Sequence, residues 1–310
     1  MSATRILVVG AGGVGGFFGA KLARAGVPVT LLARGAHLEA IQRHGLRVRS
    51  AVEGESVTKV EAFGDVRGQP PADVVLFCVK SFDTETAAAA IRPVIGADTA
   101  VVSLQNGVDN EETIDRVLGA GHAVGGVAYV FATIESPGVI AHRFAGHVVI
   151  GELDGRPSAR LVRLQAAFTA AGVRAEVVPD VRRALWQKYL MISAQAGMTS
   201  LARAPIGVIR AVPESWRMYR RIVEELAAIG RAAGVPLADD VVETIVKAAE
   251  GLAPEAYSSL HHDLTQGRRL ELEALHGHAV RLGDRLGVPA PMVFAVYAAL
   301  KPHADGGPPR

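Results

Sequence analysis

Residues 6–16 read ILVVGAGGVGG, a short apolar run followed at once by glycines. Gly10, Gly12 and Gly15 form the pattern G-x-G-x-x-G, in which the first glycine permits a tight turn and the second lets a pyrophosphate approach the backbone. The third allows the following helix to pack closely on the strand. The stretch therefore predicts the strand–turn–helix of a dinucleotide-binding domain, whose cofactor-binding residues are Gly10, Gly12, Gly13, Val14 and Gly15.

Outward from this loop, the first part of the chain alternates short β-branched runs with segments of helical spacing. The strand candidates are mostly apolar throughout, which is typical of strands covered on both faces in a parallel sheet. The predicted strands are Ile6–Val9, Val29–Leu32, Val74–Val79 and Ala100–Leu104, the helices between them are Val14–Ala25, His37–His44 and Thr84–Ile95, and further runs at Ala123–Phe131, Val148–Gly151 and Ala175–Val178 extend or edge the sheet. This repetition predicts an α/β fold with a Rossmann-type, doubly wound sheet.

The character of the sequence changes near residue 180, after which apolar residues recur at helical spacing for more than a hundred residues. Prolines separate these segments, as they do at helix starts and stops. The predicted helices are Leu185–Met198, Ser215–Ala233, Asp239–Ala249, Arg269–Leu286 and Met292–Leu300. We expect an NADP-binding domain over residues 1–179, as argued below, and an all-helical substrate and catalytic domain over residues 180–310.

Composition places the chain among soluble globular proteins. Its 310 residues exceed what one core usually serves, 49% of them are hydrophobic and 21% are charged. The net charge of +2, from scattered basic residues, argues against a nucleic-acid partner. One cysteine excludes an intrachain disulfide framework. The uncharged stretch 6–20 is too rich in glycine for a signal peptide or a membrane span, so we expect a cytoplasmic protein with no membrane partner.

The end of the second predicted strand bears on the choice of dinucleotide. An NAD-binding unit normally offers a carboxylate there to the ribose 2′-hydroxyl, whereas this chain has Arg34 and no carboxylate before Glu39. A guanidinium can clamp a 2′-phosphate with two hydrogen bonds, which favours NADP(H). The alternative is a solvated surface arginine.

Lysine is rare in this chain, with six lysines among the 33 basic residues, and a lysine can give up its proton where an arginine cannot. Lys80 ends a predicted strand at the carboxyl edge of the sheet, where ligands bind. Lys188 lies on an otherwise apolar helix just past the domain boundary. Asn106, in Gln105-Asn106-Gly107, follows another strand, where it either forms a turn or meets the nicotinamide or the substrate.

Several motifs now agree in order and spacing. They are GAGGVGG at 10–16, Arg34, VKS at 79–81, QNGV at 105–108, LWQK at 185–188, RAPIG at 203–207, and SSLHHD followed by ELE within 258–273. With them the chain resembles the ketopantoate reductase (2-dehydropantoate 2-reductase) family over roughly residues 5–300. The resemblance implies NADPH-dependent reduction of a 2-keto acid, in that family a step of pantothenate biosynthesis. The apolar helices also leave room for a homodimer, which members of the family often form.

The resemblance also implies roles for single residues. Lys188 corresponds to the general acid, and Glu271 to the glutamate that positions the lysine and the substrate. Ser259 and Asn106 correspond to substrate-binding residues, Asn106 contacting the cofactor as well, and Lys80 lies along the cofactor cleft. The chemistry agrees, because hydride addition develops negative charge on the carbonyl oxygen, which an ammonium stabilises and protonates. From the sequence alone, Glu271 borders an apolar stripe as either a site residue or a solvated rim.

Two positions depart from the family pattern. Members usually carry asparagines four and eight residues after the lysine, where this chain has Ile192 and Ala196. Loss of two amide side chains removes hydrogen bonds that could select a polar substrate, so a more apolar keto acid is the alternative to 2-dehydropantoate. A further alternative is a non-catalytic NADPH-sensing protein, although such a protein has no need of a general acid.

The histidines in 261–278 could suggest a metal site. His261 and His262 are adjacent and His276 and His278 are two apart, so helical geometry aims the members of each pair at different faces. We therefore expect no metal site and interpret these histidines as surface or capping residues.

Overall fold

The structure, a computed structural model, describes residues 4–307. The chain forms two compact units. One unit contains residues 1–105 and 110–181, and the other contains residues 106–109 and 182–310. The second unit thus includes a four-residue segment that is distant in sequence from the rest of it.

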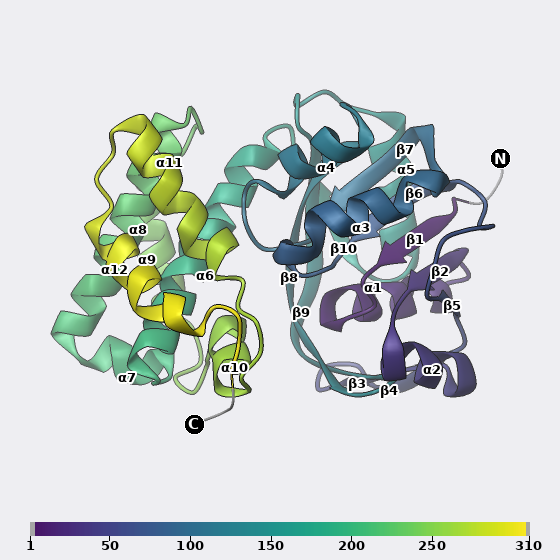
Figure 1. The fold of residues 1–310 in the computed structure, drawn as a ribbon, viewed down its shortest axis with the longest axis horizontal. Helices are drawn as coiled ribbons and strands as arrows, with labels where there is room; N and C mark the ends of the chain where they lie inside the picture. Colours follow the sequence, from purple (N-terminus) through teal and green to yellow (C-terminus); the bar gives the residue numbers. More distant parts are fainter. Residues whose placement is uncertain (1–3, 308–310) are drawn as a thin grey trace. The chain divides into compact units, whose positions relative to one another are not determined.

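The first unit is built on one mixed sheet (Figure 1). Its strands are β1 (Ile6–Val9), β2 (Val29–Leu32), β3 (Leu46–Ser50), β4 (Gly54–Thr58), β5 (Glu61–Phe63), β6 (Ala72–Phe77), β7 (Ile95–Ser103), β8 (Ala123–Ser136), β9 (Val139–Glu152) and β10 (Arg174–Val177). They follow the order β4-β3-β9-β8-β7-β6-β1-β2-β5, with β10 paired to β9. The strands β7, β6, β1 and β2 run parallel to their neighbours, which confirms the predicted α/β fold class.

Helices cover both faces of this sheet. They are α1 (Gly13–Arg24), α2 (Gly35–His44), α3 (Thr84–Ile91), α4 (Asn110–Leu118) and α5 (Ala159–Ala170), with single turns η1 (Ser81–Asp83) and η2 (Arg92–Val94). Because side chains alternate along a strand, Ile6 and Val8 pack into a core with α1 and α5, whereas Leu7 and Val9 pack with α3 and α4. Two apolar layers therefore enclose β1, the strand that carries the glycine loop.

Several predicted boundaries in this unit are wrong. The predicted helix Thr84–Ile95 ends at Ile91, because Pro93 cannot continue an α-helix, and β7 begins at Ile95. The predicted runs at Ala123–Phe131 and Val148–Gly151 belong to much longer strands that pair as the antiparallel hairpin β8–β9. Strands β3, β4 and β5 and helices α4 and α5 have no counterpart among the predicted elements.

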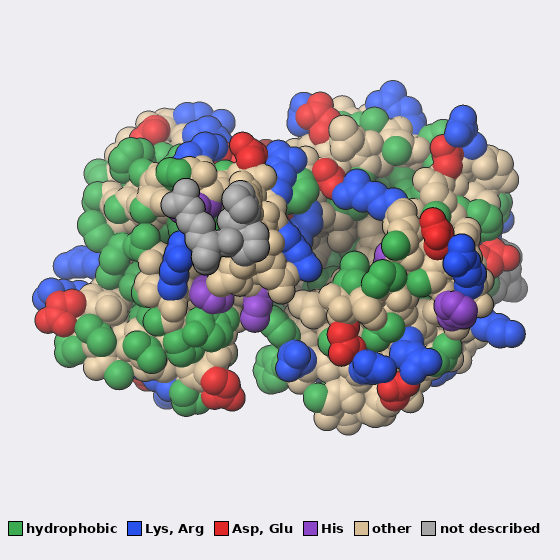
Figure 2. Space-filling model, turned by 60° about the horizontal axis from the view of Figure 1, so that its bottom comes forward, with side chains coloured by type: hydrophobic (Ala, Val, Ile, Leu, Met, Phe, Trp, Pro, Cys, Tyr) green, Lys and Arg blue, Asp and Glu red, His purple; other side chains and the backbone are tan. Residues whose placement is uncertain are grey.

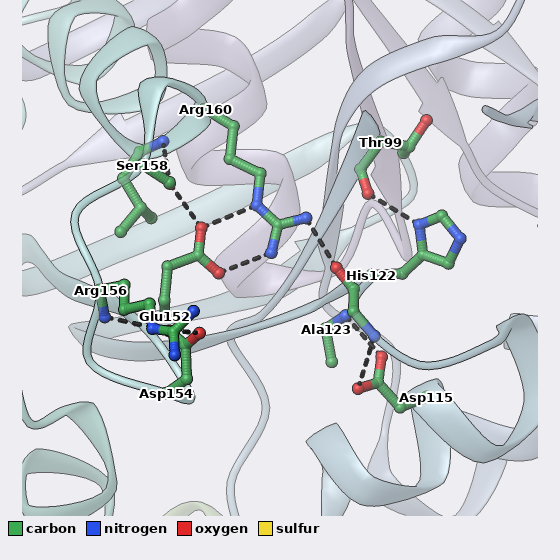
Figure 3. A network of polar contacts seen from close by, with 11 residues as sticks. Thr99, Asp115, His122, Ala123, Glu152, Asp154, Arg156, Ser158 and Arg160 are labelled. Carbon is green, nitrogen blue, oxygen red and sulfur yellow. Dashed lines mark hydrogen bonds and ion pairs between the residues drawn. The ribbon is translucent and has the colours of Figure 1, made fainter. Parts of the chain in front are cut away.

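A buried polar network fastens the carboxyl end of β9 to the start of α5 (Figure 3). Arg160 donates from Nε to the Glu152 carboxylate (2.7 Å), and Ser158 donates to the same carboxylate. Arg160 also donates to the Gly121 carbonyl oxygen (2.8 Å), just before β8. The side chains of Glu152 and Arg160 are largely shielded from solvent, so each needs the other to balance its charge.

The second unit is helical, as predicted. Its elements are α6 (Val181–Ala202), α7 (Ile206–Ala211), α8 (Pro213–Ala232), α9 (Val241–Glu250), α10 (Ser259–Thr265), the π-helical turn η3 (Glu273–Gly277), α11 (His278–Leu286), α12 (Pro291–Leu300) and η4 (Lys301–His303). Its core gathers apolar residues of α6, α8, α9 and α12, such as Leu190, Ile222, Ile245 and Val296. Helices α7 and α10 were not among the predicted elements.

Two expectations about this unit are corrected. The predicted helix Arg269–Leu286 begins only at Leu272, just before η3, because the Leu270 amide donates to the Ala304 carbonyl oxygen (2.8 Å). The interpretation of the histidines as surface residues is wrong for His261 and His276, which are buried. Within residues 4–307, no three His, Cys, Asp or Glu side chains cluster as metal ligands would.

The surface carries charged side chains of both signs (Figure 2). The Lys and Arg side chains visible in Figure 2 are distributed over both units with Asp and Glu among them. No helix in the described part of the chain combines the length and the apolar character that a bilayer span requires.

Candidate functional site

The glycine loop has the backbone geometry that its predicted role requires. Gly10, which follows β1, has φ of +92°, a conformation that disfavours any side chain. A Cβ atom on Gly15 would lie 2.2 Å from the Gly10 carbonyl oxygen, so only glycine lets α1 come this close to the turn. These two glycines allow the strand to reverse directly into the helix.

The next glycines differ in what surrounds them. A Cβ atom on Gly12 would meet no heavy atom within 4 Å, whereas one on Gly13 would lie 1.9 Å from the Ala132 carbonyl oxygen. Gly12 is the N-cap of α1, no side chain caps it, and the first turn, which includes half-buried Val14, has no acidic residue. An open space in front of an uncapped, twelve-residue helix fits a phosphate group, because the free amides there attract an anion.

Arg34 lies beyond the end of β2 and Lys80 beyond the end of β6, the two strands that flank β1. The Arg34 side chain is 90% exposed and forms an ion pair with Asp83 at 3.2 Å. Its exposure leaves the guanidinium accessible to a 2′-phosphate, for which it would have to leave or share Asp83. Lys80 is exposed and precedes η1, three residues after β6 ends at Phe77, so the predicted strand Val74–Val79 extended too far.

Sequence reasoning missed two residues that hold this edge of the sheet. His37 donates from Nε2 to the Ala11 carbonyl oxygen (2.8 Å), and its Nδ1 accepts from the Gly138 amide (3.0 Å). Burial lowers the His37 pKa, which maintains the neutral ring that both bonds require. Gln105 donates to the Val79 carbonyl oxygen (3.0 Å) and to the Thr84 hydroxyl (2.8 Å). No motif marks His37, and Gln105 lies within the QNGV motif at 105–108, which predicted a role only for Asn106.

Asn106 lies in the segment of 106–109 that folds with the helical unit. Val108 packs against the core of that unit, and Asp109 forms an ion pair with His278 of α11 at 3.0 Å. The His278 contact lowers the pKa of Asp109 against the effect of burial, which raises it. These contacts fix half-buried Asn106 within the unit that also contains Lys188 and Glu271.

Lys188 and Glu271 form an electrostatic pair inside the helical unit. Lys188 lies on α6, and Glu271, which is only 6% exposed, lies two residues before η3. Desolvation lowers the Lys188 pKa to about 8, while the negative charge of Glu271 acts to raise it. The interpretation of Glu271 as a solvated rim residue is therefore wrong, since its carboxylate is buried where it acts on the lysine.

Ser259 is exposed at the first position of α10. Its neighbour Ser258 is committed to structure, because its oxygen accepts from the His261 amide (3.1 Å) and shares a hydrogen bond with the Thr199 hydroxyl (2.8 Å). His261 in turn bonds the Thr199 carbonyl oxygen through Nδ1 (3.1 Å). These contacts tie the start of α10 to the end of α6 and leave the hydroxyl of Ser259, rather than that of Ser258, toward solvent.

Comparison with known proteins identifies this arrangement. Residues 6–155 match the family described as "Ketopantoate reductase PanE/ApbA", and residues 180–304 match "Ketopantoate reductase PanE/ApbA C terminal". The chain belongs to the ketopantoate reductase family. It is therefore an oxidoreductase of a family of keto-acid reductases, and the resemblance inferred from the motifs is confirmed.

Relatives in this family cover nearly the whole chain. A 2-dehydropantoate 2-reductase of Archaeoglobus fulgidus is 33% identical over 290 residues, which are 93% of this chain and 94% of that protein. A PanE/ApbA family ketopantoate reductase of Ralstonia eutropha is 37% identical, with a TM-score of 0.90 over 97% of this chain and 98% of that one. A D-mandelate dehydrogenase solved with NADH and anilino(oxo)acetate has the same fold, with a TM-score of 0.90 over 97% and 98% of the two chains at 21% identity.

In this ketopantoate reductase fold, both positions that depart from the family motif lie on α6. Ile192 and Ala196 follow Lys188 by one and two helical turns, which places them on the face of the lysine. Ile192 is half-buried against the helical core, and Ala196 is 2% exposed. The helix face that continues from Lys188 is therefore apolar where amide side chains were expected.

Proposed function

We propose that this protein reduces a 2-keto acid to the 2-hydroxy acid with NADPH, and that Lys188 donates the proton to the carbonyl oxygen. The substrate is 2-dehydropantoate or a related keto acid. Residues 1–179 bind the cofactor through the glycine loop, Arg34 and Lys80. Residues 180–310 supply the catalytic groups Lys188 and Glu271 and the substrate-binding Ser259, and Asn106, which folds with the helical unit, contacts both substrate and cofactor.

The observation that carries this proposal is the pairing of half-buried Lys188 with the buried carboxylate of Glu271. A lysine transfers a proton near neutral pH only if its pKa is brought down toward that range, and desolvation lowers the Lys188 pKa to about 8. Glu271 offsets part of this effect and keeps the ammonium protonated at neutral pH. A lysine on the protein surface would have neither a pKa lowered by desolvation nor a buried carboxylate as its partner.

Each site residue has its own role in the reaction. Bound NADPH supplies the hydride for the carbonyl carbon. The Lys188 ammonium donates a hydrogen bond to the carbonyl oxygen, stabilises its developing negative charge and transfers its proton. Glu271 holds the ammonium in place through its charge, and the Ser259 hydroxyl donates to the substrate carboxylate. Arg34 binds the 2′-phosphate of the cofactor.

A second candidate substrate, a 2-keto acid with an apolar side chain, is favoured by Ile192 and Ala196. Without amide groups on that face of α6, a polar side chain of the substrate would lose hydrogen bonds to water and gain none in the protein. The shared fold of the D-mandelate dehydrogenase, which was solved with the aromatic ligand anilino(oxo)acetate, supports an apolar pocket on this scaffold.

Replacing Lys188 by Met tests the role of the general acid. We expect kcat to fall by about 10²–10⁴-fold, while the Kd for NADPH, measured by fluorescence titration, stays within about twofold. In the wild type, kcat for reduction should decline as pH rises through about 8, because the protonated lysine that donates is lost above its pKa.

Lys247→Met is the matched control, since Lys247 is an exposed lysine on α9 of the same unit. Its rate and pH profile should equal those of the wild type. An active Lys188→Met protein would refute the proposed acid. A wild type that binds NADPH tightly but reduces no keto acid would favour the sensor over the enzyme.

A substrate panel separates the two candidate substrates. NADPH oxidation is followed at 340 nm with 2-dehydropantoate, 2-oxoisovalerate and benzoylformate, and the series is repeated with NADH. We expect kcat/KM to be higher for the apolar acids by about tenfold, the scale of hydrophobic pocket discrimination, and higher with NADPH than with NADH. A strong preference for 2-dehydropantoate would show that Ile192 and Ala196 are tolerated replacements, and equal rates with both cofactors would remove the role of Arg34.

A further inference from the structure

The residue after Lys188 connects α6 to the turn that follows Glu271. Tyr189 is 1% exposed, and its hydroxyl donates to the Leu275 carbonyl oxygen at 2.8 Å. The ring is fixed independently by an edge-on contact with Trp186, whose centroid lies 5.4 Å away. The hydroxyl therefore makes one defined bond to the backbone of η3 from a ring that packing holds in place.

The acceptor lies where the helical hydrogen-bond ladder is irregular. Leu275 is the central residue of the π-helical turn η3, and its own amide donates to the Glu271 carbonyl oxygen (3.1 Å). In a regular α-helix the Leu275 carbonyl would accept from the Ala279 amide. The Tyr189 hydroxyl donates to this same carbonyl oxygen, and burial raises the pKa of the phenol, so the hydroxyl keeps the proton that it donates.

A second bond joins the same two segments. His276, also in η3, is fully buried and donates from Nε2 to the Ser193 carbonyl oxygen of α6 at 3.0 Å. Burial lowers the His276 pKa to about 4, so the ring is neutral at working pH and keeps its proton on the nitrogen that faces the carbonyl. Tyr189 and His276 together bond α6 to η3 on either side of one turn of α6.

We propose that Tyr189 is a positioning residue of the reductase, whose hydroxyl fixes α6 against η3 so that Lys188 and Glu271 keep their mutual placement. The inference rests on the proposed role of Lys188. Lys188 precedes Tyr189 by one residue, and the Leu275 amide bonds the backbone of Glu271, so a single side chain links the two members of the pair.

The other charges around η3 are balanced by their own partners. Asp109 is paired with His278, and Glu273 is paired with Arg281 and with Lys301. Removal of the Tyr189 hydroxyl leaves these ion pairs in place. A change in the titration of Lys188 in such a variant would therefore report its placement relative to Glu271.

Tyr189→Phe tests the inference, because it removes one oxygen and keeps the ring on Trp186. We expect the alkaline decline of kcat to move to lower pH by about half a unit, since a looser Glu271 supports the ammonium less. At pH 8, kcat should fall about twofold with the KM for NADPH unchanged. A residue that served stability alone would lower the melting temperature and leave the pH profile where it is.

Tyr219→Phe is the matched control. Tyr219 is a fully buried tyrosine of α8 in the same unit, and its hydroxyl has no hydrogen-bond partner among the described residues. This variant should keep the wild-type pH profile. If Tyr219→Phe shifts the profile as much as Tyr189→Phe does, or if neither shifts it in an active enzyme, the inference is overturned.

A second readout does not depend on turnover. Six lysines give few signals in a protein labelled with ¹³C at the lysine ε-carbon, and the signal lost in Lys188→Met identifies Lys188. Its titration midpoint should be lower in Tyr189→Phe than in the wild type, and an identical midpoint would overturn the inference. Absence of reductase activity in the wild type would refute the proposed function, while the titration still decides whether Tyr189 positions Lys188.

Discussion

At the scale of single residues, the glycines of the loop after β1 are glycines for different structural reasons. Gly15 is a glycine because its Cβ would overlap a backbone oxygen inside the protein, and Gly10 because of its positive φ. Gly12 has neither constraint, since its φ is −71° and the space around its Cβ is open. Nothing within the fold therefore requires a glycine at position 12, and the proposed cofactor site supplies a reason for it.

Two alanine substitutions separate these roles. Gly12→Ala should melt within a few degrees of the wild type but lose the rise in melting temperature that NADPH causes, because the new methyl group occupies the space of the phosphates. Gly15→Ala should lose about 1–3 kcal/mol of stability even without cofactor, because backbone must move to admit the methyl group. Thermal melts with and without NADPH measure both effects.

An equal rise with NADPH in the wild type and in Gly12→Ala would show that the cofactor does not approach this backbone. A Gly15→Ala protein as stable as the wild type would show that α1 can retreat from the turn at no cost.

The sequence was a good guide to residues whose chemistry is unusual and a poor guide to those that support them. Lys188 was recognisable because lysine is rare in this chain and because a known motif contains it. His37 and Tyr189 were not, because each bonds a backbone atom distant in sequence, Ala11 and Leu275. No side-chain pattern marks a backbone acceptor, so such residues emerge only from the fold.

At the scale of elements, the prediction succeeded where periodicity was local. The strands Ile6–Val9 and Val29–Leu32 were placed correctly, because both runs are short and mainly apolar; Arg5 and Gly10 bound the first, and Pro28 precedes the second. The long hairpin β8–β9 was underestimated, because its outer part is largely exposed and lacks the apolar signal. Strand content there comes from pairing between strands rather than from burial.

Helix ends depended on partners that the sequence does not reveal. The start of α12 has no capping side chain of its own, and the carboxylate of Glu225 on α8 accepts from the amides of Met292 (2.9 and 3.0 Å) and Val293 (2.9 Å). A carboxylate here also suits the positive end of the helix dipole. From the sequence, Glu225 would be interpreted as a solvated charge on α8, although its carboxylate caps the N-terminus of α12.

At the scale of the whole molecule, buried histidines make the fold sensitive to acid. The His276 pKa is lowered to about 4 by burial, whereas an unfolded histidine titrates near its ordinary pKa of 6.5. Below pH 6.5 the unfolded chain therefore binds a proton that the folded chain does not, which favours unfolding. Burial also lowers the pKa values of His37, His147 and His261, so they act in the same direction.

We expect the free energy of unfolding to be highest above pH 6.5 and to fall as the pH drops toward 4. His276 alone should contribute about 3 kcal/mol of that loss. Urea unfolding at pH 7 and pH 4 measures it. In His276→Gln, which keeps an N–H donor for the Ser193 carbonyl, the loss over this range should be smaller by that amount. Equal losses in the two proteins would mean that His276 is protonated in the folded state without penalty.

The segment Asn106–Asp109 also limits how this protein can be divided or recombined. Since these four residues fold with the helical unit, the chain passes between the two units three times, after residues 105, 109 and 181. A gene fragment that starts at residue 182 would encode α11 without the Asp109 that pairs with His278. A chimaera that takes its helical unit from a relative should therefore exchange residues 106–109 together with 182–310, as two inserts rather than one.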